Sequence, residues 1–362
     1  MAPNHYPALT GIRALASCMV FLHHHGTNVA ALQHPLAQAI VGQLFTGVVF
    51  FFVLSGFLIA DRYYDTARMG FRNYFMRRFF RVVPLYALLT TLTFIVSWVL
   101  GDARFRALFF EFVANLTFLR GWSAELWDTG ILQGWSLTVE MTFYLLAPLL
   151  FLSIQWRRWM LVALPIGFVA IGVLLVFACQ GKAPLGFMGS FDLLFGITFF
   201  GRCSEFFVGV ALALFLRRRG MWTFQHATLI GGILCMAAMC GTAYLDVDYR
   251  HASGVLLLNL LLPIGVGIFY WGLLTERTVI RSILSSAVAQ FMGRTSYAFY
   301  LIHLGVVFTA VYMSTGNLVL SFLLLQGAAW LLYRSVEEPI ARWSRRRFPM
   351  DQELRSSVRT TN

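Results

Sequence analysis

The chain has 362 residues, of which 59% are hydrophobic and only 12% are charged, about half the charged share of a soluble domain. Its formal net charge of +12 would suit a nucleic-acid-binding protein, but the cations lie in short clusters between apolar runs, as in the loops of membrane proteins. The composition therefore excludes a soluble or nucleic-acid-binding domain and predicts an all-α polytopic membrane protein.

Apolar runs long enough to cross a bilayer recur from one end of the chain to the other. They predict about ten transmembrane helices, at residues 9–30, 44–60, 82–100, 135–153, 159–178, 199–216, 225–244, 254–274, 294–314 and 317–334. If the N-terminus is cytoplasmic, 21 of the 28 lysine and arginine residues fall on the cytoplasmic side and six fall outside. Because cytoplasmic loops are enriched in cations, we expect both termini in the cytoplasm. The membrane domain should cover residues 1–343, followed by a basic cytoplasmic tail at 344–362.

The first predicted span carries Arg13 and, further along, His23-His24-His25. In a helix, His24 lies about 20° from Arg13 around the axis and about 16 Å further along it. Ionisable groups within a membrane usually face the protein interior or a wet cavity, and a neutral imidazole can take a hydroxyl proton near pH 7. We therefore expect Arg13 near an anionic donor and His24 near an acceptor hydroxyl. The alternative is an interfacial histidine cluster that marks the helix end.

The second predicted span contains Ser55-Gly56, a pair of small residues that would let another helix approach closely. Tight packing is the expected role. Ser55 is not expected to be a nucleophile, because the G-x-S-x-G pattern is absent.

A basic segment leads into the third predicted span and contains Arg77, Arg78 and Arg81. Arg78 and Arg81 are three residues apart and share a helix face. Their guanidinium groups could hold the phosphates of coenzyme A, or the segment could instead be an anchor for anionic lipids.

The fourth predicted span opens with Trp135-Ser136 and carries Glu140 about one turn into the apolar region. The preceding external segment is rich in tryptophan, as expected for an interfacial belt or a sugar-facing mouth. A buried carboxylate needs a partner, and pairing with His24 would orient the ring as the third group of a catalytic triad does. The alternative is an ion pair with an external arginine.

The ninth predicted span contains Tyr297 and ends near His303. His303 either lines the same cavity as His24 or is a core histidine bonded to a backbone carbonyl, and the core role is the preferred interpretation. The five cysteines show no CxxC spacing, so neither a metal site nor a disulfide framework is predicted.

Six motifs, taken in chain order, resemble those of the membrane acyltransferase family 3. They are the Arg13–His24 spacing, G-V-x-x-F-F-x-L-S-G-F at 47–57, R-R-x-x-R-x-x-P at 77–84, W-S-L-x-x-E at 135–140, S-Y-x-x-Y-L-I-H at 296–303 and E-E-P at 337–339. The chain departs from the family pattern at Thr10 and Val49, where members often carry Asp, and at Met141, where a second Glu is common.

The resemblance implies an enzyme that transfers an acyl group, with acetyl the expected group, from cytoplasmic acyl-CoA to a hydroxyl of a surface carbohydrate or lipid-linked glycan. It implies His24, Glu140 and Arg13 as catalytic residues and Arg78, Arg81 and Arg77 as the site for the acyl-CoA co-substrate. Trp135, Ser136, Tyr297 and His303 are the expected substrate-binding residues. No bound cofactor is expected, and the expected location is the inner cell membrane, in contact with its lipids. The competing hypotheses are a transporter or flippase without covalent chemistry, since membrane histidines and glutamates also serve proton relays, and a catalytically silent membrane scaffold.

Overall fold

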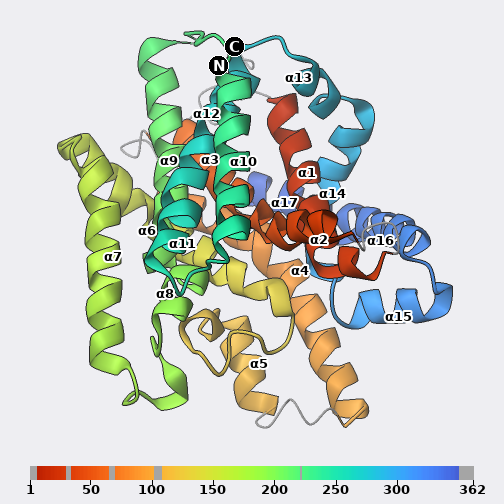
Figure 1. The fold of residues 1–362 in the computed structure, drawn as a ribbon. Helices are drawn as coiled ribbons and strands as arrows, with labels where there is room; N and C mark the ends of the chain where they lie inside the picture. The colour runs from red at the N-terminus through yellow and green to blue at the C-terminus, as the bar shows by residue number, and fades with distance from the viewer. Residues whose placement is uncertain (1–5, 30–33, 65–69, 102–107, 221, 350–362) are drawn as a thin grey trace, which may run out of the picture.

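The computed structural model describes residues 6–29, 34–64, 70–101, 108–220 and 222–349. Within these ranges the chain is built from helices and forms no β-strand, which confirms the all-α class (Figure 1). The α-helices are α1 (Pro7–His25), α2 (Pro35–Gly42), α3 (Gly47–Tyr63), α4 (Phe71–Val99), α5 (Leu108–Leu116), α6 (Trp135–Trp156), α7 (Met160–Cys179), α8 (Phe191–Ile197), α9 (Phe199–Arg219), α10 (Ala227–Leu245), α11 (Ala252–Leu256), α12 (Leu262–Thr275), α13 (Val279–Leu284), α14 (Ala287–Ile302), α15 (Val306–Thr315), α16 (Leu318–Leu332) and α17 (Glu338–Arg347). Two π-helical segments, Leu257–Leu261 and Tyr333–Glu337, join α11 to α12 and α16 to α17.

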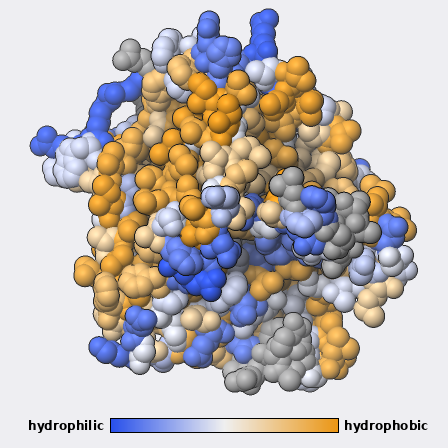
Figure 2. Space-filling view, viewed as in Figure 1, coloured by the Kyte–Doolittle hydropathy of each residue, from blue (hydrophilic) through white to orange (hydrophobic). Residues whose placement is uncertain are grey.

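Eight helical stretches of the described chain are long and apolar enough to cross a membrane. They are Ala37–Tyr63, Phe71–Val99, Leu132–Trp156, Met160–Cys179, Phe191–Arg218, Ala227–Leu245, Ala252–Thr275 and Leu318–Arg347. The bent pair α14 and α15 would make a ninth. The first predicted span, α1, is not in this set; it carries Arg13 and three histidines. Apolar side chains cover much of the viewed face in Figure 2, with hydrophilic residues at its upper edge, as a multi-pass membrane protein requires.

The ninth predicted span is not a single helix. α14 ends at Ile302 and α15 begins at Val306, and the two axes differ by 96°. Gly305 lies at the break with φ of 83°, a conformation that is readily available only to glycine. The break comes directly after His303, so the bend places this histidine at a helix end within the bundle.

The close approach predicted for Gly56 is confirmed, and its partner is α9. A Cβ atom at Gly56 would lie 2.1 Å from the carbonyl oxygen of Phe206, and one at Gly209 would lie 2.1 Å from that of Val53. Each glycine thus lies against the backbone of the opposite helix. This reciprocal contact fixes α3 against α9 at the centre of the bundle.

One end of the bundle, here called the basic end, is where α1, α10 and α14 begin and where α3, α9 and α12 end. Gln290 at the start of α14 donates to the Pro7 carbonyl at the start of α1 (2.7 Å). Arg217 near the end of α9 donates to the Asp61 carbonyl near the end of α3. Glu276, which follows α12, accepts from the backbone N–H of Ala227 at the start of α10 (2.6 Å).

The expected boundary between membrane domain and tail falls inside α17, which runs to Arg347. Arg77 donates from Nε to the Phe348 carbonyl (2.5 Å) and from Nη2 to the Arg345 carbonyl (3.1 Å), and Asn73 donates to the Pro349 carbonyl (2.8 Å). The first residues of the expected tail are therefore packed against α4. Residues 350–362 lie outside the described chain.

Candidate active site

A cavity of 360 Å³ lies at the end of the bundle opposite the basic end, and His24 contributes to its wall. We call it the histidine cavity. Its lining includes side chains from α1, the 124–135 segment, α9, the loop after α10 and α14: Val20, His23, His24, Trp127, Gln133, Trp135, Arg202, Tyr249 and Tyr300. Aromatic rings with a few convergent polar groups are typical of a small-ligand site.

Four histidines gather where α1 ends and α14 ends, and three of them are bonded to backbone carbonyls. His23 Nδ1 lies 3.3 Å from the Val41 carbonyl, His25 Nε2 lies 2.8 Å from that of His303, and His303 Nδ1 lies 2.7 Å from that of Tyr300. A carbonyl only accepts, so each of these nitrogens carries a proton. His24 is half-buried and makes no hydrogen bond to any residue in the described ranges. Of the two rings that line the cavity, His23 and His24, that of His24 is therefore the one with no ring nitrogen bonded to a described residue.

The second ring nitrogen of His303 is buried and has no partner within the described chain. Because Nδ1 of this ring donates to the Tyr300 carbonyl, the neutral ring leaves Nε2 as a bare acceptor. The ring centroids of His303 and His24 are 5.4 Å apart. A buried hydrogen-bond-accepting nitrogen without a described partner thus lies near the His24 ring.

Gln133 links the cavity wall to the end of α14. Its amide N–H₂ donates to the carbonyls of Tyr300 and Leu301, both at 2.9 Å. Its Oε1 is buried and accepts from no residue in the described part of the chain. Arg120 is 0% exposed and donates to carbonyls of the same loop, at Trp127, Ile131 and Leu132. This buried guanidinium fixes the loop that carries Gln133 and Trp127.

A buried ion pair supports the other side of the cavity. Arg202 and Glu205, one turn apart on α9, are 2% and 0% exposed and make a two-point contact. Arg202 also donates to the Tyr249 hydroxyl (2.9 Å), and its guanidinium lies 5.6 Å from the Trp135 ring centre. Burial raises the pKa of Tyr249 to about 12, so its phenol remains neutral. The pair holds Trp135 and Tyr249 in fixed positions along the wall.

Glu140 does not pair with His24 as the sequence predicted. It accepts instead from the Ser55 hydroxyl on α3 (2.8 Å) and from the Tyr144 hydroxyl one turn along α6. Five residues separate Glu140 from Trp135, which turns its side chain about 140° around the helix. Trp135 therefore faces the cavity while Glu140 faces α3. The predicted alternative, an ion pair with an external arginine, is not formed with any described residue either.

Arg78 is held by phenol groups near the basic end. Its Nη2 donates to the Tyr63 hydroxyl (2.7 Å), and its guanidinium lies 4.9 Å from the Tyr63 ring centre and 5.8 Å from that of Tyr144. No described carboxylate lies within ion-pair distance, and Arg78 Nε is buried without a partner in the described ranges. An enclosed cation with a free N–H is suited to receive an anion.

Arg81 lies one turn from Arg78 on α4, and Arg13 and Arg81 both lie near the carboxylate of Glu337; the three arginines are here called the arginine cluster. Arg13 Nε donates to the Ser296 hydroxyl on α14 (3.1 Å). Arg81 Nη2 lies 4.0 Å from Oε1 of Glu337, a carboxylate buried in the π-helical segment. None of the three arginines lines the histidine cavity. Arg77, expected beside them, instead binds the backbone of the tail.

The expected substrate-binding residues divide into two groups. Trp135 lines the histidine cavity, whereas Ser136, Tyr297 and His303 are buried behind its wall. Ser136 bonds to the Tyr300 hydroxyl (2.9 Å), and Tyr297 donates to the Val82 carbonyl on α4 (2.7 Å). The predicted core role of His303, a bond to a backbone carbonyl, is present.

Sequence reasoning missed several residues of the site, including Gln133, Tyr300, Arg202 and Tyr144. Gln133 lies two residues before the W-S-L-x-x-E motif, and Tyr300 lies inside S-Y-x-x-Y-L-I-H. Their positions in or beside these motifs could have indicated both residues. Within the described chain, no group of histidine, cysteine and carboxylate side chains could hold a metal ion.

Comparison with known proteins supports one family. The model of the acyltransferase domain of acyltransferase family 3 matches residues 6–334. The chain is 27% identical to the acyltransferase MdmB of Streptomyces mycarofaciens over 384 aligned residues, which cover 95% of this chain and 94% of that protein. It is 32% identical to nodulation protein 10 of Rhizobium leguminosarum bv. viciae over 171 residues, covering 41% of this chain and 44% of that protein.

A third relative is longer than this chain. It is a putative O-acetyltransferase of Staphylococcus aureus (strain COL), 23% identical over 370 residues that cover 93% of this chain and 57% of that protein. No solved structure matches the chain. Because the family model extends over nearly all of the helical bundle, the chain belongs to acyltransferase family 3, a family of multi-pass membrane acyltransferases.

Proposed function

We propose that this protein is an O-acyltransferase that moves an acyl group from acyl-CoA to a hydroxyl of a surface carbohydrate, with His24 as the general base. The observation that carries the proposal is the open ring of His24 in a cavity of 360 Å³, beside three histidines whose rings are bonded to carbonyls. A base must have a free nitrogen within reach of the hydroxyl that it deprotonates.

The lining of the histidine cavity supports a sugar-like acceptor. Trp127 and Trp135 offer flat faces to an apolar ring face, while Gln133 Oε1 offers a buried acceptor for a hydroxyl. An acceptor hydroxyl bonded to Gln133 would therefore lie in the same cavity that the His24 ring lines.

In the proposed step, a nitrogen of His24 takes the proton of the acceptor hydroxyl while its oxygen bonds to the thioester carbonyl carbon. The carbon–sulfur bond then breaks, and the imidazolium returns the proton to the departing thiolate, which leaves as CoA. The other His24 nitrogen carries a proton in the neutral ring, and in the proposed step His303 Nε2, which has no described partner, would accept it. His303 would thereby take the orienting role that the sequence assigned to Glu140.

The arginine cluster supports an anionic donor. Arg78 has a buried N–H without a partner, and Arg81 is 37% exposed, so both can bind phosphate oxygens of CoA. Arg13, about three helix turns from His24 on the same side of α1, would face the donor along its path. Because the arginine cluster does not line the histidine cavity, the packing between them must open for the thioester to reach His24.

The names of relatives favour acetyl as the group transferred, since one is a putative O-acetyltransferase. An inner cell membrane location, with the basic end in the cytoplasm, would place the donor site where acyl-CoA is made.

The experiment is transfer of label from radiolabelled acetyl-CoA to candidate glycans by the purified protein in liposomes. The expected product is a base-labile ester on the glycan, formed only when donor and acceptor are both present. Transport of a glycolipid across the bilayer without any acyl donor, with no ester formed, would contradict the proposal.

A further inference from the structure

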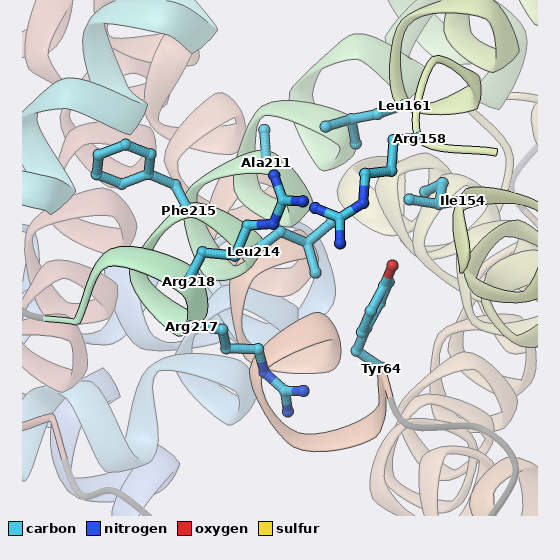
Figure 3. Close-up of a pocket in the computed structure, with 9 residues that line it drawn as sticks. All are labelled: Tyr64, Ile154, Arg158, Leu161, Ala211, Leu214, Phe215, Arg217 and Arg218. Atoms are coloured by element: carbon cyan, nitrogen blue, oxygen red, sulfur yellow. The ribbon is translucent and has the colours of Figure 1, made fainter. Parts of the chain in front are cut away.

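A second cavity, of 600 Å³, lies at the basic end and is separate from the arginine cluster. It is bounded by the turn between α6 and α7, the last residues of α9 and the residue that follows α3, and Figure 3 shows its side chains. Arg158 comes from the turn, Arg217 and Arg218 from α9, and Tyr64 from the end of α3. In the sequence these arginines belong to no recognised motif and count only among the cations expected on the cytoplasmic side.

Two of these cations converge without a counter-charge. In Figure 3 the guanidinium groups of Arg158 and Arg218 extend toward each other across the cavity, and the Tyr64 hydroxyl points into the same space. Neither arginine makes a hydrogen bond or ion pair with a described residue. Arg217 is engaged differently, with its guanidinium 5.8 Å from the Tyr64 ring centre and a bond to the Asp61 carbonyl. Like charges brought together repel each other unless an anion lies between them.

The remaining wall of the cavity is apolar and includes one residue of α7, a helix whose surface is largely exposed. Leu161 and Phe215 line it, and the neighbouring α7 residues Val162 and Ile166 are 63% and 64% exposed. Only 11% of the most apolar stretch of α7 is buried. A ligand that fits must therefore combine an anionic head with hydrocarbon that continues along a lipid-facing helix.

We propose that this cavity binds an anionic phospholipid, with its phosphate between Arg158 and Arg218 and its acyl chains along Leu161 and Phe215. The guanidinium fork matches two phosphate oxygens at once. The bound lipid would fill the space between the peripheral helix α7 and the central helix α9. The proposal does not depend on the acyl-transfer chemistry, because neither His24 nor the arginine cluster takes part.

The test compares lipid binding by native mass spectrometry of the detergent-purified protein. The probes are dioleoyl-phosphatidylglycerol and, as a neutral counterpart, dioleoyl-phosphatidylcholine. The double variant Arg158→Gln/Arg218→Gln removes both converging charges. Arg157→Gln is the matched control, because Arg157 is adjacent in sequence but lies over the Trp156 ring and does not line the cavity.

We expect wild type and Arg157→Gln to retain phosphatidylglycerol in preference to phosphatidylcholine, and the double variant to bind it about tenfold or more weakly. The three substituted side chains, Arg157, Arg158 and Arg218, are exposed in the folded protein, so thermal unfolding should be unchanged across the set. Equal binding by the double variant, or equal binding of the two lipids, would overturn the proposal. Displacement of the phospholipid by free CoA would also overturn it, and would identify the cavity as a second donor-binding surface.

Discussion

The His24 ring differs from the three neighbouring histidine rings because it makes no hydrogen bond to a described backbone carbonyl. His23, His25 and His303 each use a ring nitrogen to satisfy a backbone carbonyl near a helix end, which fixes their tautomers and orientations. Neither nitrogen of His24 bonds to a described residue; its ring lines the cavity and packs against the rings of His23 and His303. Three structural histidines thus surround one that is chemically available.

The orienting role of His303 is tested by two substitutions, one that can replace its Nδ1 and one that can replace its Nε2. Asparagine can keep the donation to the Tyr300 carbonyl but does not reach the position of Nε2, whereas glutamine reaches that position. We expect His303→Asn to lower kcat by roughly 10–100-fold, less than loss of the base itself, and His303→Gln to retain more activity. The measurement is kcat against pH for acetyl transfer.

A purely structural role for His303 would give a different pattern. His303→Asn would then keep the wild-type kcat and pH profile, because the bond to Tyr300 is preserved, and only thermal stability would change. That result would remove His303 from the proposed mechanism.

At this scale the sequence predicted the availability of His24 but not the partner of Glu140. The helix period places Arg13 and His24 on one side of α1, because both lie on the same helix. It carries no information on how α6 is rotated against α1. That rotation turns Glu140 toward Ser55 and Tyr144, and it follows from packing of the whole bundle.

At the scale of elements, the contact between α3 and α9 holds the centre of the molecule. Gly56 and Gly209 each meet the backbone of the other helix, so neither position has room for a methyl group. The sequence predicted this use of Gly56 from its small neighbour Ser55. It did not predict the break between α14 and α15, because the stretch around His303 is mostly apolar and contains a single glycine, Gly305.

The α3–α9 contact makes a prediction about stability. Gly56→Ala should lower the free energy of unfolding by about 1–3 kcal/mol, because the added methyl would displace the Phe206 carbonyl region. Gly232→Ala is the matched control, since a Cβ atom there meets nothing within 4 Å. Thermal unfolding in detergent should show a lower Tm for the first variant only, and equal Tm values would contradict the packing argument.

At the scale of the whole molecule, the two ends of the bundle have different chemistry. The basic end carries the arginine cluster and the cavity of 600 Å³ proposed to bind a phospholipid, and the opposite end carries the histidine cavity. The cation distribution in the sequence predicts that the basic end faces the cytoplasm. Composition alone therefore predicted the class of the fold and an orientation for it, while the two cavities could be found only once the helices were assembled.

The orientation is tested by labelling from one side of the membrane. In a variant without native cysteines, Arg346→Cys should react with an impermeant maleimide only from the cytoplasmic side. Lys182→Cys, in the exposed turn after α7, should react only from the outside. Labelling of both positions from the same side would contradict the assigned topology.

The central claim is that the imidazole of His24 removes the proton from the acceptor. It is tested most directly by the rate of acetyl transfer from radiolabelled acetyl-CoA to a glycan acceptor for His24→Ala, with His251→Ala as control because His251 is exposed on a loop and does not line the histidine cavity. The account predicts that His24→Ala is slower by about 10²–10⁴-fold while its Tm and the His251→Ala rate match wild type. Transfer by His24→Ala at the wild-type rate would contradict it.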